Sequence, residues 1–453
     1  MHRTNLEEYK IQIKKLFGIG GPLIVNNLSI AGIAFADAVM AGSIGARELA
    51  AVAVGSSFWF IGFLFCLGIL MALSPIIARH FGAGNYSLIG RYMRQGVYLG
   101  IFLSIPILLI GQFATAPLLE SFGINPEFRE MTVGYVNAVT FGAPAIFIFL
   151  ALRFMTEGIG YLRPIIFTSI FSLICNVFLN YVLMFGHFGF PALGAVGCGY
   201  ASAITMWIIM FFLIYFVLRS KHYESFNLFS RAAPLRFDVF KEIIFLGIPI
   251  AITITAEAGL FSAITILMGT RGTDIAAAHQ IAINFASTTF MIPLSLSGAT
   301  TVLVGQLIGA GKLREAKQSG WLGIFFCTSF MIISAIFLLL FRGPIVSLYT
   351  QDVNVMDIAT SLLLIAAIFQ IADGIQIGAA GALRGYKDTA LPMIINLFAF
   401  WVVGFPLAYL AAITYQAPPI YIWSALVLAL TIGAALLTWR YLKVSSKTEN
   451  YKN

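Results

Sequence analysis

The sequence predicts an all-α integral membrane protein with twelve transmembrane helices in two six-helix lobes. Three observations predict this fold class. Of 453 residues, 60% are hydrophobic and 10% are charged, whereas soluble domains are about half apolar and a quarter charged. Apolar stretches long enough to span a membrane occur twelve times. The second half of the chain also repeats features of the first half, so two similar lobes are expected.

Each apolar stretch meets the length requirement of a transmembrane helix, which is about 20 predominantly apolar residues. Short segments with turn residues separate the stretches, such as GAGN at 82–85 and GAGK at 309–312. The predicted spans are residues 16–42, 50–79, 95–118, 131–152, 164–185, 195–218, 243–269, 276–305, 320–341, 357–383, 389–413 and 420–439.

The basic residues predict how these spans are oriented, because Lys and Arg are retained in short cytoplasmic loops. Of the 27 basic residues, 23 fall on the side of the two termini, including Arg153 and Arg384 in predicted cytoplasmic loops. The opposite side has only Arg47, Arg129, Arg271 and Arg342. Both termini are therefore expected to be cytoplasmic. This orientation accounts for the net charge of +8, so no nucleic-acid partner is expected.

The first apolar run is too long for a signal peptide, and it contains Asn26 and Asn27. The cysteines fall inside apolar spans without paired spacing, so neither a disulfide framework nor a cysteine metal site is predicted. They are Cys66, Cys175, Cys198 and Cys327.

An internal repeat appears when residues 14–84 are laid over residues 241–311 without a gap, at an offset of 227. The overlay gives about 16 identities, roughly 23%, well above chance for this composition. Gly20 matches Gly247 and Pro22 matches Pro249. Because glycine allows close helix approach and proline bends a helix, these matches predict the same shape in both halves.

The repeat predicts three parts of the chain. These are an N-terminal six-helix lobe at 1–218, a cytoplasmic linker at 219–242, and a C-terminal six-helix lobe with a cytoplasmic tail at 243–453. Each half has an even number of spans, so both begin on the same side of the membrane. The halves are therefore expected to be related by a pseudo-two-fold axis along the membrane normal, with substrate bound between them.

Three carboxylates lie well inside predicted spans: Asp37 in the first, Glu257 in the seventh and Asp373 in the tenth. An ionised carboxylate at the bilayer centre costs about 2.5–3.5 kcal/mol on insertion scales. One interpretation is that these groups are simply protonated or hydrogen-bonded within the bundle. The other is functional: a low dielectric favours the neutral form, which suits proton uptake and release. Carboxylate and amide oxygens also suit a hard cation such as Na⁺.

The two lobes differ in these polar groups. Asn176 and Asn180 are spaced i, i+4 in the N-terminal lobe, so they share a helix face and can converge with Asp37. Glu257 and Asp373 belong to the C-terminal lobe. The spans are predicted to contain no central Arg or Lys, so the interior charge is acidic and favours cationic cargo.

Most of the 41 Phe residues are expected to face lipid or fill the core. Phe290 and Phe369 are candidates for contact with a lipophilic cation, and His279 is expected to be a packed polar residue. The chain has no nucleotide-binding loop of the G-x-x-x-x-G-K-[ST] type, so an ion gradient is expected to drive transport. It also has no hydrolase or transferase motif, so no enzymatic activity is expected.

Four short motifs stand out along the chain: FADAVMAG at 35–42, LAAVAVG at 49–55, PALGAVGCG at 191–199 and ALRGYKD at 382–388. They resemble the multidrug and toxic compound extrusion (MATE) family, NorM-type branch. Together they are specific, and the resemblance covers nearly the whole chain. It implies a twelve-helix, two-lobe exporter that exchanges a cytoplasmic cationic or amphipathic drug for Na⁺ or H⁺.

The resemblance also implies site residues. Asp37, Asn176 and Asn180 match the family's N-lobe cation and proton site, and Ser202 is a further candidate ligand. Glu257 and Asp373 match the acids of the C-lobe cation site, so the resemblance allows Na⁺ at either set.

Two further positions concern the drug and the C-lobe ion. Asp352 matches an outer acidic residue implicated in drug contact in some members. Where some members have a tyrosine near the C-lobe cation site, this chain has Phe290 or Phe369. Phenylalanine has no hydroxyl oxygen, which argues against direct tyrosine coordination of Na⁺ here.

These observations together predict a secondary active multidrug efflux transporter of the bacterial inner membrane that works by alternating access. Ion binding at the acidic sites is expected to weaken drug binding and so release the drug outside. No cofactor is expected besides the coupling ion, and the chain is expected to act as a monomer among membrane lipids. Two alternatives are a flippase of a lipid-linked saccharide, which would need a cationic central cavity, and a membrane-integral enzyme.

Overall fold

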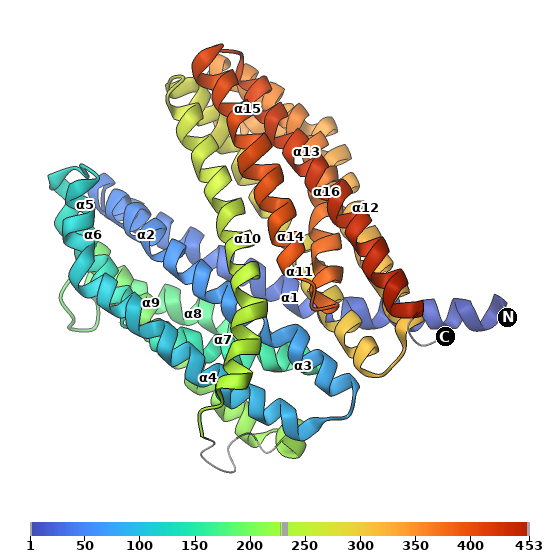
Figure 1. Cartoon of the computed structure of the whole chain (residues 1–453). Helices are drawn as coiled ribbons and strands as arrows, with labels where there is room; N and C mark the ends of the chain where they lie inside the picture. The colour runs from blue at the N-terminus through green and yellow to red at the C-terminus, as the bar shows by residue number, and fades with distance from the viewer. Residues whose placement is uncertain (1, 227, 229–233, 451–453) are drawn as a thin grey trace. The chain divides into compact units, whose positions relative to one another are not determined.

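The computed structural model describes residues 2–226, 228 and 234–450, and the regular secondary structure of these residues is helical, without a strand (Figure 1). The chain forms two compact units. The N-unit contains residues 25–251, and the C-unit contains residues 1–24 with residues 252–453. Two helices, α1 (His2–Ile44) and α10 (Phe237–Gly269), contribute residues to both units.

The remaining helices belong to one unit each. The N-unit has α2 (Ala46–Met71), α3 (Leu73–Gly82), α4 (Tyr86–Leu109), η1 (Ile110–Ala114), α5 (Thr115–Ser121), α6 (Pro126–Thr140), α7 (Ala143–Ile159), α8 (Arg163–Phe185), α9 (Gly194–Arg219) and η2 (Lys221–Phe226). The C-unit has α11 (Thr273–Gly309), α12 (Leu313–Ser347), α13 (Val353–Gly385), α14 (Ala390–Leu397), η3 (Phe398–Gly404), α15 (Phe405–Tyr409), η4 (Leu410–Thr414) and α16 (Pro419–Asn450).

The number of membrane spans agrees with the sequence prediction. Eleven helices of the described chain are long and apolar enough to cross a membrane, and the number is twelve if α6 and α7 form one span. These two helices are bent by 46° at the break between Thr140 and Ala143, within the predicted span 131–152. The predicted all-helical membrane fold is confirmed.

The boundaries of the compact units differ from those predicted for the lobes. The first part of α1 groups with the C-unit, and the first part of α10, up to Ala251, groups with the N-unit. The two exchanged segments are equivalent in the internal repeat, so the exchange is reciprocal. Each unit therefore ends within a helix, whereas the sequence predicts lobe boundaries between helices.

Equivalent glycines explain this exchange. A Cβ atom built on Gly20 of α1 would lie 3.0 Å from a methyl carbon of Leu296 in α11. A Cβ atom built on Gly247 of α10 would lie 2.8 Å from the Cα atom of Ile69 in α2. Both pairs are related by the repeat offset of 227 residues. The repeated glycines therefore let each first helix pack closely on its partner helix.

We expect Gly247→Ala to lower the free energy of unfolding by about 1–3 kcal/mol, because the added methyl group would overlap the backbone of Ile69. Thermal unfolding of the purified protein in detergent measures this effect. Gly18→Ala is the matched control, because a Cβ atom at Gly18 has no neighbouring atom within 4 Å. Equal unfolding temperatures for the two variants would contradict the close packing of α10 on α2.

The predicted linker, residues 219–242, is partly helical and packed. It contains η2, and α10 already begins at Phe237. Two side chains of α4 hold it: Arg94 donates a hydrogen bond to the carbonyl of Leu228 at 3.1 Å, and Gln95 donates one to the carbonyl of Pro234 at 3.0 Å. Residues 227 and 229–233 of the predicted linker lie outside the described residues.

Candidate functional site

The N-unit brings together the polar residues predicted from its sequence. Asp37 lies on α1, Asn176 and Asn180 lie one turn apart on α8, and Ser202 lies on α9. The Nδ2 atom of Asn180 donates a hydrogen bond to Oδ1 of Asp37 at 2.6 Å and lies 3.2 Å from Oδ1 of Asn176. Asn176 in turn donates to the hydroxyl of Ser202 at 3.4 Å. Three helices thus position one connected cluster.

This cluster is shielded from solvent and has spare acceptor capacity. Asp37 is 9% exposed, and Asn176 and Asn180 are at most 1% exposed. The Oδ1 atom of Asn180 is buried and has no hydrogen-bond partner among the described residues. Cys198 of α9 also lies near the Asp37 carboxylate. A carboxylate beside an unsatisfied amide oxygen is chemically suited to hold a proton or a hard cation.

The C-unit contains the other two predicted acids. Asp373 of α13 is 3% exposed, and it is close enough to Glu257 of α10 for the two carboxylates to interact electrostatically. Glu257 also interacts with Arg384, a buried residue near the end of α13. The Nη2 atom of Arg384 donates a hydrogen bond to the hydroxyl of Ser297 at 2.8 Å. Glu257 therefore interacts both with the second acid, Asp373, and with a buried guanidinium group.

Amide side chains near Asp373 present further oxygens. Gln370 and Gln376 lie one turn before and after it on α13, and Asn396 lies on α14. All three are at most 3% exposed, and their amide oxygens have no hydrogen-bond partner among the described residues. The oxygens of Gln376 and Asn396 lie 3.3 and 3.7 Å from the same point, the Cβ position that Gly433 lacks. Buried acceptors without donors are uncommon and call for a proton, water or cation.

The candidate drug contacts occupy different environments. Phe369 is 3% exposed and packs in the core of the C-unit, with ring centroids 5.9 Å from Phe261 and 5.8 Å from Trp423. Phe290 on α11 is partly exposed. Asp352 caps the start of α13, where its carboxylate accepts hydrogen bonds from the amides of Asn354 and Val355 at 2.9 and 3.2 Å. Asp352 therefore has a structural role as a helix cap in addition to its predicted position as an outer acidic residue.

His279 is a packed polar residue, as predicted. It is 1% exposed, and its Nδ1 atom accepts a hydrogen bond from the indole of Trp423 at 3.1 Å. Its Nε2 atom lies 3.0 Å from the hydroxyl of Thr265, which also donates to the carbonyl of Phe261. Both ring nitrogens are therefore engaged within the protein. No group of three or more His, Cys, Asp and Glu side chains in the described residues is arranged to hold a metal ion.

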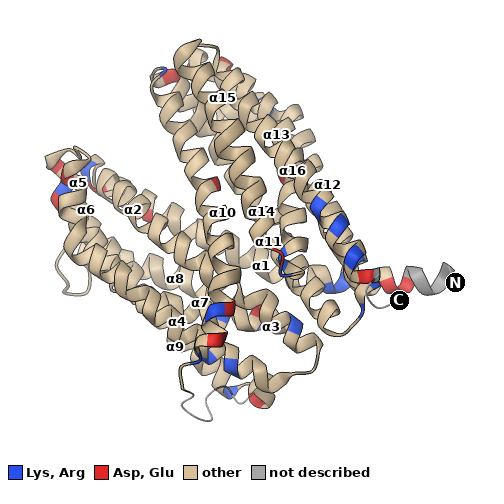
Figure 2. Cartoon of the chain, viewed as in Figure 1, with Lys and Arg blue, Asp and Glu red and all other residues tan. Residues whose placement is uncertain are grey.

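The prediction that Arg153 and Arg384 lie in cytoplasmic loops is wrong. Arg153 lies inside α7 and Arg384 inside α13, and both are largely buried. A fourth buried carboxylate, Glu157, was also missed, and it pairs with Arg153 at 2.7 Å. Figure 2 shows that most charged residues gather toward the ends of helices, with few in their middle parts. The i, i+4 spacing of Arg153 and Glu157 within an apolar run was the signal available in the sequence.

Comparisons with known proteins bear on the whole chain. The MatE family model matches residues 22–182 and 249–410, two segments whose starts differ by the repeat offset of 227. A probable multidrug resistance protein NorM of Halalkalibacterium halodurans is 37% identical over 428 residues, covering 94% of this chain and 93% of the relative. The multidrug resistance protein MdtK of Photorhabdus laumondii is 36% identical, with 95% of each chain covered.

Solved structures share the fold. The crystal structure of the eukaryotic MATE transporter AtDTX14 has a TM-score of 0.87 at 20% sequence identity, covering 98% of this chain and 99% of that chain. An outward-facing structure of a multidrug resistance MATE family transporter has a TM-score of 0.88 at 18% identity, with 97% of each chain covered. At these identities the similarity concerns the fold alone.

Proposed function

This chain belongs to the MatE family of multidrug efflux transporters, and we propose that it exchanges cationic or amphipathic drugs for Na⁺ or H⁺ across the bacterial inner membrane. One observation carries the ion-coupling proposal most directly. The Asp37 carboxylate is buried against Asn180, whose amide oxygen has no partner among the described residues. A buried carboxylate of this kind gains stability when it binds a proton or a cation.

The Asp37 cluster has a defined way to respond to a proton. In the present arrangement the amide of Asn180 donates to Asp37, which suits an ionised carboxylate. A protonated carboxyl group has an O–H to donate, so rotation of the Asn180 amide would bring its unsatisfied oxygen to accept that proton. A sodium ion would instead be held by oxygens of Asp37, Asn180 and Asn176. Either ion neutralises the charge that attracts a cationic drug.

The C-unit supplies a second candidate ion site at Asp373 and Glu257. The unsatisfied oxygens of Gln376 and Asn396 are consistent with an ion or a proton near Asp373. Neither Phe290 nor Phe369 offers an oxygen ligand. We infer that carboxylate and amide oxygens serve at this site in place of the tyrosine found in some relatives.

Charge placement supports the rest of the proposal. Both termini are proposed to be cytoplasmic, following the distribution of basic residues between the two sides of the membrane. The monomeric state remains the expectation from the sequence. The buried Arg153 is paired with Glu157, and Arg384 interacts with Glu257. Because acids offset both cations, the described residues offer no feature that favours the flippase alternative.

Reconstituted liposomes test the proposed function. We expect the purified protein to release a fluorescent lipophilic cation against its gradient when a Na⁺ gradient or a pH gradient is imposed. The two gradients are applied separately, so the experiment also identifies the coupling ion. Protein-free liposomes and liposomes without a gradient are the controls. Efflux that needs neither gradient, or no efflux under both, would contradict the proposal.

A further inference from the structure

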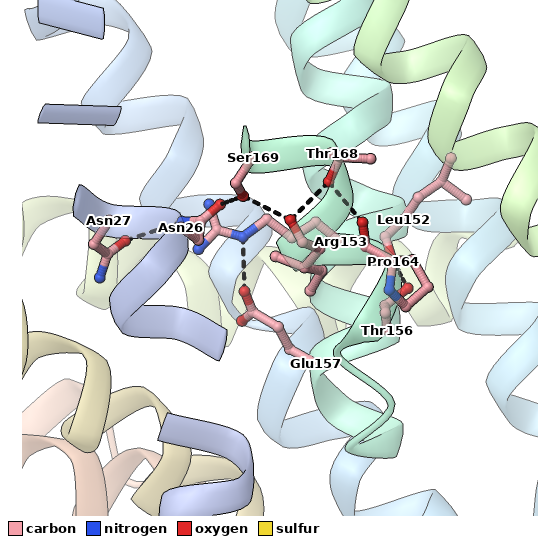
Figure 3. Close-up of polar contacts among 10 residues, drawn as sticks. Asn26, Asn27, Leu152, Arg153, Thr156, Glu157, Pro164, Thr168 and Ser169 are labelled. Carbon is pink, nitrogen blue, oxygen red and sulfur yellow. Dashed lines mark hydrogen bonds and ion pairs between the residues drawn. The ribbon is translucent and has the colours of Figure 1, made fainter. Parts of the chain in front are cut away.

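A buried polar network lies in the N-unit, remote along α1 from the Asp37 cluster. The Nε atom of Arg153 donates to a carboxylate oxygen of Glu157 one turn later on α7, at 2.7 Å. Their side chains are 11% and 7% exposed. Asn26 of α1 and Ser169 of α8 are both buried beside this ion pair. Figure 3 shows the four side chains meeting between the three helices.

Hydrogen-bond donors and acceptors determine how Asn26 is oriented. The Ser169 hydroxyl lies 2.7 Å from the carbonyl of Ile165 and 2.9 Å from the Asn26 amide. Since the hydroxyl has one proton, which it donates to Ile165, it accepts from the Asn26 nitrogen. In this orientation the Asn26 oxygen accepts from Nη2 of Arg153 at 3.2 Å and from the backbone N–H of Asn27 at 3.3 Å, in exchange for the side-chain hydrogen bond between Asn26 and Asn27. Asn26 therefore links the ion pair on α7 to Ser169 on α8.

The same two helices, α1 and α8, also meet at the Asp37 cluster. Asn26 contacts Ser169, and Asp37 contacts Asn180, so both contacts join residues 143 positions apart. The contacts are separated by 11 residues on each helix, which is about three turns and about 16 Å. Eleven residues return to nearly the same helix face. The two contacts therefore fix one register between two helices that run in the same direction.

This register matters because α1 has a weak point just before Asn26. Pro22 removes one backbone hydrogen bond of the helix. Residues up to 24 group with the C-unit, so in the described part of the chain Asn26 makes the first polar side-chain contact between α1 and another helix of the N-unit. A buried ion pair adds little net stability, but polar contacts of this kind can specify one register.

We propose that Arg153 and Glu157, acting through Asn26, are positioning residues that hold α1 in the register at which Asp37 meets Asn180. Glu157 holds the Arg153 guanidinium in place, and the guanidinium holds the Asn26 oxygen. A shift of α1 along α8 would break the contact between Arg153 and Asn26, and the same shift would move Asp37 away from Asn180. The inference rests on the proposed role of Asp37 in ion coupling.

The test measures drug affinity as a function of ion concentration, using fluorescence polarisation of a dye cation on the purified transporter in detergent. This readout does not require transport. Asn26→Leu removes the link and leaves the ion pair, and Arg153→Gln with Glu157→Gln removes the pair's charge. We expect both to shift the half-saturating concentration of the coupling ion by about tenfold. Arg153→Lys, which keeps the positive charge, is expected to shift the half-saturating concentration less than Arg153→Gln with Glu157→Gln does.

A matched control lies next to Ser169 on α8. Thr168 is fully buried, but its hydroxyl bonds only to carbonyls of its own helix, at Pro164 and Ile165. We expect Ser169→Ala to shift the half-saturating concentration of the coupling ion and Thr168→Val to leave it unchanged, although the two variants have similar stability. If Asn26→Leu fails to fold, Ser169→Ala replaces it as the test of the link between α1 and α8. The proposal is overturned if Asn26→Leu and Ser169→Ala change stability but have the same half-saturating ion concentration as Thr168→Val.

The Asp37→Asn variant separates this inference from the proposed function. If ion dependence of drug binding survives Asp37→Asn, the proposed role of Asp37 fails. If Asp37→Asn removes the ion dependence while Asn26→Leu and Ser169→Ala retain a normal midpoint, only the positioning role fails.

Discussion

Asp37→Asn is expected to abolish ion-driven drug efflux while the protein still folds and inserts normally. Asparagine has nearly the same shape as aspartate, and its oxygen can still accept the hydrogen bond that Asn180 donates at 2.6 Å. The variant lacks the negative charge, so it can neither bind and release a proton nor balance Na⁺. Efflux rates from liposomes under each ion gradient measure the effect, with protein abundance measured in the same preparation.

The control for this variant is Asp357→Asn. It makes the same chemical change at an exposed position on α13, away from both buried clusters. We expect its efflux rate to equal that of the unchanged protein. Full efflux by Asp37→Asn under both gradients would show that the buried carboxylate is not part of the coupling mechanism.

Asp373→Asn is the second substitution for which we expect complete loss of efflux. Asp373 is 3% exposed and lies close to Glu257, so one site holds two acids whose charges oppose each other. A bound ion or proton relieves this repulsion. With an uncharged Asn at position 373 there is no repulsion, so the site no longer favours binding of an ion or proton. We therefore expect transport to stop while thermal stability stays equal or rises, because one buried acid is gone.

The stability measurement distinguishes a coupling role from a packing role. Loss of efflux together with a large drop in unfolding temperature would indicate that Asp373 mainly holds the C-unit together, and it would contradict our assignment. Asp357→Asn again serves as control, since it lies on the same helix at an exposed position.

Several features of this protein could be predicted from the sequence alone. Runs of apolar residues predicted the spans, since the bilayer sets the length of a crossing helix. The offset of 227 predicted the equivalence of Gly20 and Gly247, which the structure places at matching helix contacts. The i, i+4 spacing of Asn176 and Asn180 predicted one helix face, and both residues do lie beside Asp37. These features depend on the order and spacing of residues along the chain, so they can be predicted without the tertiary structure.

Other features were decided only by the tertiary structure. The burial of Arg153 and its pairing with Glu157 were not predicted, because a charged residue near the end of an apolar run can belong either to the helix or to the following loop. The exchange of the first parts of α1 and α10 between units was also missed, since it depends on which distant helix each glycine meets. The alignment of Asn26 with Ser169 and of Asp37 with Asn180 likewise depends on how two helices slide against each other. Long-range packing sets that register, and no local pattern in the sequence specifies it.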